Sequence, residues 1–150
     1  MLITTHIAAT LFLGKYLDLS GPGWLVAFLG GVAIDIDHAL LNFKYLPNIK
    51  LFFKKASDVS GRFNQHWWTH EAFFGAISGA AIGVFCAILL AVQWWIFLLF
   101  QFSHIALDGL MKFEHQPLAP FSKRKYFGPL ASGTKIEFVV SLIVLGVIIL

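Results

Sequence analysis

Apolar residues are gathered into five long segments along this chain, and polar or glycine-rich stretches separate these segments. The apolar segments cover residues 2–16, 24–41, 67–92, 94–111 and 136–150. A helix that crosses a membrane needs about 20 apolar residues, with a range of about 17–25. The second, third and fourth segments reach or approach this length, whereas the first and fifth are short enough to be tilted, re-entrant or packed against the others. The pattern predicts an all-α, membrane-embedded bundle of four to five helices.

The composition supports a single membrane-embedded domain over residues 1–150. The chain is 58% hydrophobic and only 13% charged, with a mean hydropathy of +0.77, whereas a soluble domain has about 25% charged residues. The first residues lack the basic region of a signal peptide, so we expect them to belong to the mature chain. The one cysteine, Cys86, lies in an apolar stretch and is expected to be a buried core residue.

Basic residues are concentrated in two polar stretches, residues 42–65 and 112–135. Each stretch contains five Lys or Arg residues and one acidic residue. Two expected spans separate the stretches, so they fall on the same side, and the positive-inside rule assigns that side to the cytoplasm. We therefore expect a multi-pass protein of the inner membrane with a cytoplasmic N-terminus. Because membrane orientation explains the net charge of +3, we expect no nucleic-acid partner.

Histidines and acidic residues cluster at one end of these apolar segments. The candidate metal ligands are His6, Asp35, Asp37, His38, His66, His70, His104 and Asp108. Such side chains are costly inside a bilayer and need a partner there. Spacings of three or four residues place the members of several pairs on one helix face. On helices that run up and down, all eight residues would converge near the cytoplasmic face.

The chemistry of these residues points to divalent metal ions. Imidazole and carboxylate without thiolate suit Zn²⁺, Mn²⁺ or Fe²⁺. Eight candidates exceed the four ligands of one tetrahedral zinc, which predicts two or three metals, or one metal with supporting partners. The alternative is a hydrogen-bonded polar network that lines a cavity. Asp37 and Glu71 are the candidate catalytic carboxylates; alternatively, Glu71 is an ordinary acidic residue in the first turn of a helix.

A basic loop at residues 117–125 is expected on the same side as these candidate ligands. Lys123, Arg124 and Lys125 are candidate binding residues for an anionic substrate or for phospholipid headgroups; alternatively, they only fix the topology. Trp67 is a candidate wall of a substrate pocket, with an interfacial aromatic belt as the alternative. His115 stands outside the clusters in a polar loop and is expected to be solvated. Gly30, Gly31, Gly75, Gly79 and Gly83 are expected to permit close helix packing.

In this order the clusters resemble the LexA-binding, inner-membrane-associated metal-dependent hydrolase family. The resemblance spans about residues 5–125 and rests on an early histidine, a PDIDH-like element (AIDIDH, 33–38), an HRGxTHS-like element (HWWTHE, 66–71) and an HxxxD helix (104–108). Trp67 and Trp68 replace the Arg-Gly of the family element, Glu71 replaces its Ser, and Ala33-Ile34 replaces the usual approach to the Asp pair. The departures remove an arginine that would bind substrate. A remoter similarity to the zinc phospholipase C and P1 nuclease superfamily implies a trinuclear zinc site that cleaves phosphoesters.

These observations favour a membrane-bound hydrolase that uses metal-activated water at the cytoplasmic bilayer surface. A phospholipid or another lipid phosphate fits the position best, with membrane lipid as the surrounding partner. The alternative of another class is a non-catalytic membrane protein that uses metals for structure, handles metal ions or docks a cytosolic regulator. A metal transporter is a third alternative, but its sites commonly lie near the midplane of the membrane.

Overall fold

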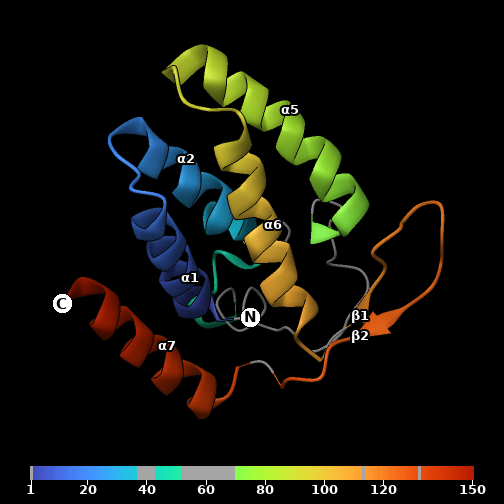
Figure 1. The fold of residues 1–150 in the computed structure, drawn as a ribbon. Helices are drawn as coiled ribbons and strands as arrows, with labels where there is room; N and C mark the ends of the chain where they lie inside the picture. Colours follow the sequence, from blue (N-terminus) through green and yellow to red (C-terminus); the bar gives the residue numbers. More distant parts are fainter. Residues whose placement is uncertain (1, 37–42, 52–69, 113, 132) are drawn as a thin grey trace.

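The computed structural model describes residues 2–36, 43–51, 70–112, 114–131 and 133–150, and most of these are helical (Figure 1). The helices are α1 (Ile3–Tyr16), α2 (Pro22–Gly31), the short 3-10 helices η1 (Ala33–Asp35) and η2 (Phe43–Tyr45), α5 (Ala72–Leu90), α6 (Trp95–Gly109) and α7 (Lys135–Ile149). Strands β1 (Glu114–His115) and β2 (Tyr126–Phe127) form an antiparallel pair between α6 and α7. The mainly helical prediction is confirmed, but the all-α class misses this strand pair in the expected loop.

The helix boundaries depart from the apolar segments at two places. The segment at 24–41 was expected to be one long helix, yet α2 ends at Gly31 and Val32 adopts φ −130° and ψ −50°. The paired glycines Gly30 and Gly31 have low helix propensity, which favours an end at this point. The segment at 67–92 becomes helical only from Ala72, because Glu71 is extended with φ −96° and ψ 144°.

The core lies between α2, α5 and α6. Its buried apolar side chains are Val26, Ala27, Cys86, Ile96, Phe97 and Phe100, so the prediction of a buried Cys86 is confirmed. Glycines allow these helices to approach closely: a Cβ atom on Gly30 would lie 2.7 Å from the Phe97 carbonyl oxygen, and one on Gly83 would collide with the Trp94 carbonyl oxygen. Glycine at these positions is thus a packing requirement, as the sequence predicted.

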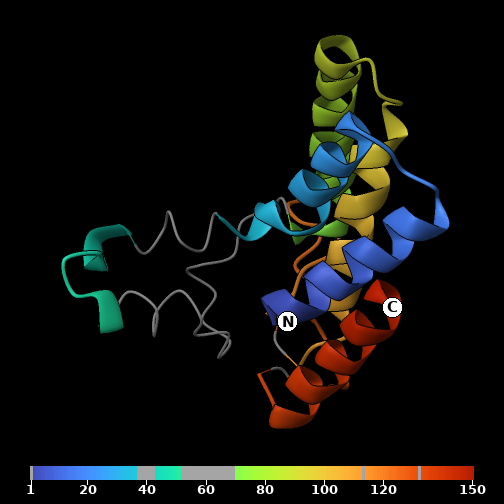
Figure 2. The same ribbon diagram turned by 90° about the vertical axis from the view of Figure 1, so that its left-hand side faces the viewer.

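The helix directions bring four chain segments to one end of the core. Gly23 at the start of α2 lies near Ile96 at the start of α6, and Gly31 at the end of α2 contacts His104 near the end of α6. These two helices therefore run parallel, while α1 and α5 run opposite to them (Figures 1 and 2). As a result, the starts of α1 and α5 meet the ends of α2 and α6.

Helix α7 lies along α1 and runs in the same direction (Figure 2). At the start of both helices, the Glu137 carboxylate accepts hydrogen bonds from the Leu2 backbone N–H at 2.8 Å and the Thr5 hydroxyl at 3.1 Å. At their other ends, the Lys15 ammonium donates to the Ile148 carbonyl. The parallel direction means that α1 and α7, if both cross the membrane, begin on the same side.

Among the described residues, α5 alone has the length and apolar composition needed to cross a membrane. Its 19 residues span about 28 Å at 1.5 Å per residue, close to the hydrocarbon thickness of about 30 Å. Side chains such as Phe85 and Ile88 lie exposed on its outer face, as lipid contact would require. Helices α2 and α6 are apolar but shorter. A bundle of four to five spans therefore stays a prediction.

Candidate metal centre

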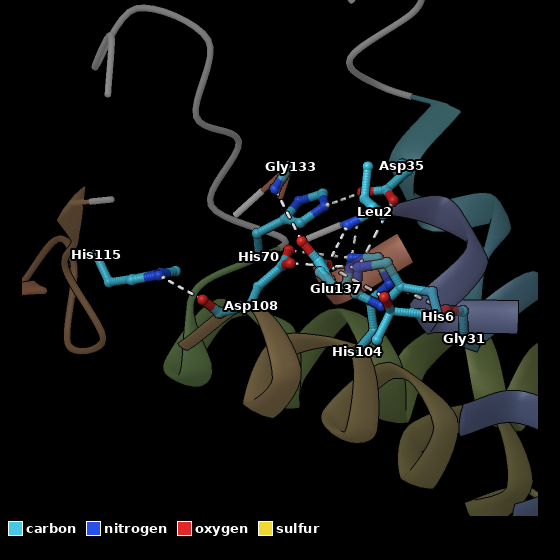
Figure 3. A network of polar contacts seen from close by, with 11 residues as sticks. Leu2, His6, Gly31, Asp35, His70, His104, Asp108, His115, Gly133 and Glu137 are labelled. Carbon is cyan, nitrogen blue, oxygen red and sulfur yellow. Dashed lines mark hydrogen bonds and ion pairs between the residues drawn. The ribbon is translucent and has the colours of Figure 1, made fainter. Parts of the chain in front are cut away.

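Five of the predicted ligands lie together where the four chain segments meet (Figure 3). They are His6 of α1, Asp35 of η1, His70 just before α5, and His104 and Asp108 of α6. Ligand atoms of Asp35, His70, His104 and Asp108 all lie within 4.8 Å of one another. Groups separated by up to about a hundred positions in the chain thus form one cluster.

The two carboxylates bridge the three imidazoles. One Asp35 oxygen, Oδ1, lies 3.2 Å from His104 Nε2 and 3.3 Å from His70 Nε2. The oxygens of Asp108 lie 3.2 Å from His6 Nε2 and 3.3 Å from His104 Nε2. The Nε2 atoms of all three histidines therefore point toward carboxylate oxygens.

The orientation of His104 is set by a backbone contact. Its Nδ1 lies 3.0 Å from the Gly31 carbonyl oxygen. A carbonyl can only accept, so Nδ1 must carry the proton and donate it. In a neutral ring Nε2 then has a free lone pair directed at the carboxylates. An imidazole whose second nitrogen donates to a carbonyl is the usual arrangement of a metal-ligating histidine.

Buried nitrogen atoms in the cluster provide a test of whether a cation fits. Within the described part of the chain, His104 Nε2 and both ring nitrogens of His6 are buried and have no partner with hydrogen-bond geometry. Leaving a buried polar atom unsatisfied typically costs about 1–3 kcal/mol. A divalent cation among these atoms would satisfy the Nε2 lone pairs and both carboxylates together. The donor set therefore fits a metal ion.

The negative charge of the carboxylates favours a cation in the cluster as well. The rings of His6 and His104 stack at a centroid distance of 3.8 Å with an interplanar angle of 13°. Two imidazolium cations this close would repel, and the neutral ring is the form that binds metal. Burial acts to raise the pKa of Asp35, but the adjacent imidazoles of His104 and His70 outweigh it and lower that pKa below its ordinary value. Asp35 is thus an anion at neutral pH.

Two residues outside the cluster support the segments that carry it. His115 is buried, and its Nε2–H donates to the Asp108 carbonyl at 2.9 Å, so the prediction of a solvated His115 is wrong. Its burial follows from the pairing of β1 with β2, which a local pattern could not reveal. Glu71 is also buried, and its carboxylate accepts the Gln116 backbone N–H at 2.7 Å. Glu71 therefore holds the segment after α6 against the start of α5, and its catalytic role stays a prediction.

The remaining predicted site residues are not in the cluster that the structure describes. Asp37, His38, His66 and Trp67 lie outside the described residues. Lys123 and Arg124 are exposed on the loop between β1 and β2, and the Lys125 ammonium lies 3.1 Å from the Glu114 carboxylate. Lys125 is therefore engaged in an ion pair, whereas the side chains of Lys123 and Arg124 form no ion pair with any residue that the structure describes.

Comparison with known families adds one finding to this geometry. The sequence pattern of the YdjM inner membrane protein family matches residues 1–150. The chain belongs to the YdjM inner membrane protein family. No curated protein and no solved structure matches it.

Membership of the YdjM family confirms the predicted inner-membrane location in general terms. The number of spans and the cytoplasmic orientation stay predictions, because one helix alone among the described residues has the length of a span. LexA binding and hydrolysis, which the sequence resemblance implied, also stay predictions. A group of Asp and His residues able to bind a metal ion is shown, whereas the identity and number of metals are not.

Proposed function

We propose that this YdjM-family protein is a membrane-bound, metal-dependent hydrolase whose site faces the cytoplasmic bilayer surface. The observation that carries the proposal is the convergence of three imidazoles and two carboxylates from four chain segments. Nitrogen and oxygen donors without thiolate suit Zn²⁺, with Mn²⁺ or Fe²⁺ as alternatives. A divalent metal bound there would lower the pKa of a coordinated water and neutralise charge that develops on a substrate oxygen.

The protein's own residues would hold and orient such a metal. The Gly31 carbonyl keeps the His104 ring in the tautomer that presents Nε2. His115 holds the last turn of α6 through the Asp108 carbonyl. Asp37, His38 and His66 remain further proposed ligands, which would allow two or three metals in place of one. Asp37 and Glu71 are the proposed catalytic carboxylates.

A phosphoester is the favoured substrate class, and a phospholipid or another lipid phosphate is the favoured substrate. Hard oxygen ligands and a divalent metal suit phosphoryl groups. Exposed Lys123 and Arg124 lie on the loop that follows the site-bearing helix α6, where they would attract an anion to the membrane surface. Lys125 and Trp67 complete the proposed substrate-binding set.

The test is an activity assay on the purified protein in lipid. Protein loaded with Zn²⁺ or Mn²⁺ should release phosphate or a phosphorylated headgroup from lipid, or cleave a chromogenic phosphoester, and chelation should abolish this activity. Asp37→Asn should lower the rate at least about 100-fold, equivalent to ~2.7 kcal/mol of barrier. If metal binds yet phosphoesters, esters and amides all remain intact, the hydrolase proposal is refuted.

Burial of the histidines favours a second candidate, a non-catalytic metal-binding membrane protein that handles metal ions or docks a cytosolic regulator. The side chains of His6 and His104 are fully buried and that of His70 is nearly so, and structural metal sites are closed whereas catalytic sites keep an open position. The Asp35 side chain is 23% exposed, which favours the catalytic candidate because a catalytic metal site keeps an open position. The activity assay separates the two candidates, because both require bound metal and only one requires turnover.

A further inference from the structure

The segment between α6 and α7 carries several exposed apolar side chains although it is not helical. Leu118, Phe121, Tyr126, Phe127 and Leu130 are all large apolar residues with about half or more of their surface exposed, and Phe121 reaches 77%. Single exposed apolar residues are normal on a soluble surface, but a cluster marks a site of contact with a partner or a membrane. We call residues 114–130 the interfacial hairpin.

The interfacial hairpin is held firmly to the end of the helical pair α5–α6 at which α5 begins and α6 ends. On the α6 side, Lys112 N–H donates to the Leu130 carbonyl and Leu130 N–H donates to the Leu110 carbonyl, at 2.6 Å and 2.9 Å. On the α5 side, Phe73 N–H donates to the Pro117 carbonyl at 3.1 Å. Its position relative to the membrane helix α5 is therefore set by backbone hydrogen bonds.

The most exposed of the large apolar side chains in the interfacial hairpin lies where α5 begins. The ring of Phe121 contacts that of Phe73 edge to face, at a centroid distance of 4.9 Å and an angle of 84°. Phe73 is the second residue of α5, the one described helix with the length of a span. Ile77, four residues after Phe73 and therefore on the same face of α5, is the first of the exposed large apolar residues of that helix. Phe121 thus lies beside the first turn of the helix that is the candidate membrane span.

Positive charge accompanies this apolar surface. Exposed Lys123 and Arg124 follow Phe121 by two and three positions, and Lys112 is exposed at the other edge of the interfacial hairpin. The acidic Glu114 is compensated by Lys125. Aromatic and apolar side chains beside lysine and arginine are the combination that lies at the boundary between headgroups and acyl chains.

We propose that the interfacial hairpin rests on the bilayer surface and binds anionic phospholipid headgroups. Phe121 and Leu118 would enter the boundary between headgroups and acyl chains, and Lys123 and Arg124 would contact phosphates. Charge complementarity with anionic lipid and continuity with the outer face of α5 select lipid over a protein as the occupant. The proposal does not depend on catalysis, so it can fail or succeed independently of the hydrolase assignment.

The test places a fluorescent probe on the interfacial hairpin of the full chain. Leu118→Cys is labelled with an environment-sensitive fluorophore in a Cys86→Ala background, which removes the one native thiol. The protein is placed in nanodiscs of phosphatidylcholine alone or of phosphatidylcholine with phosphatidylglycerol. We expect blue-shifted emission and quenching by shallow nitroxide lipids, both stronger in the anionic discs. Lys123→Gln with Arg124→Gln should weaken this contact about fivefold per cation.

A matched double variant controls for the loss of net charge. Lys44→Gln with Lys50→Gln removes the same two charges from residues 43–51, which lie to one side of the helices (Figure 2), and it should leave the probe signal unchanged. Water-like emission in both lipid compositions overturns the proposal. So does a signal that is insensitive both to anionic lipid and to the Lys123 and Arg124 substitutions. A probe that leaves water only when a soluble protein is added identifies a protein-docking surface, which also overturns it.

Discussion

Replacement of Asp35 by asparagine is the sharpest single test of the metal centre. One oxygen of Asp35 lies within 3.3 Å of Nε2 atoms from both His70 and His104, and the other lies 4.0 Å from His6 Nε2. Asp35 therefore links imidazoles from three other chain segments. Asparagine keeps the shape of the side chain and one acceptor oxygen, but it removes the negative charge that a divalent metal requires.

The expected loss of metal affinity follows from the position of Asp35 in the cluster. Loss of a partner that only orients a metal ligand lowers the metal affinity about 10–100-fold, and loss of a direct ligand should lower it at least as much. This range corresponds to roughly 1.4–2.7 kcal/mol of binding free energy. Because Asp35 contacts two imidazoles directly, we expect Asp35→Asn to lie at the upper end of the range or beyond it.

The assay is metal content by elemental analysis of detergent-purified protein, together with affinity measured by competition with a chromogenic chelator. Asp18→Asn is the matched control, since it makes the same chemical change at an exposed position between α1 and α2. Asp18 has φ 50°, a conformation that asparagine tolerates well, so its fold and metal content should be unchanged. His115→Ala does not serve as a control, because His115 donates to the Asp108 carbonyl.

Two results would refute the reasoning about Asp35. If Asp35→Asn binds Zn²⁺ with wild-type stoichiometry and affinity, Asp35 is not a ligand or an orienting partner. If the wild-type protein itself takes up no Zn²⁺, Mn²⁺ or Fe²⁺ at saturating concentrations, the cluster is a hydrogen-bonded polar network. Thermal unfolding of each variant in detergent separates a lost ligand from a lost fold.

Three further predictions concern packing and topology. Gly31→Ala should lower the free energy of unfolding by about 1–3 kcal/mol through overpacking, because its Cβ would collide with the buried Thr10 side chain. Gly146→Ala is the control and should leave the free energy of unfolding unchanged, because its Cβ would meet no atom within 4 Å. Equal thermal stabilities of the two variants would contradict the prediction. Glu137→Ala should cost about 1–3 kcal/mol and speed proteolysis of α7, whereas Glu137→Gln, which retains an acceptor oxygen, should cost less. Lys123→Cys, in a Cys86→Ala background, should be labelled by an impermeant thiol reagent from the cytoplasm only, and labelling from outside would reverse the proposed orientation.

The amino-acid sequence determined the parts of this protein that depend on local periodicity and composition. Helices α1, α5, α6 and α7 lie within the predicted apolar segments or within a residue of them, because apolar runs of this length are typical of helices rather than strands. The spacing of four residues between His104 and Asp108 was enough to place both on one face of α6. Charge and histidine content indicated a membrane protein with polar groups at one end.

Contacts between segments that are distant in the chain decided how the site residues come together. The break at Val32 turns Asp35 toward His70 and His104, and the stacking of His6 on His104 depends on the packing of α1 against α2 and α6. The burial of His115 accompanies the pairing of residues 126–130 with the chain after α6. Each of these features depends on the register between elements that are far apart in the chain. A local hydrophobic pattern specifies which face of a helix is buried, but only the packed helices determine which side chains of different elements meet.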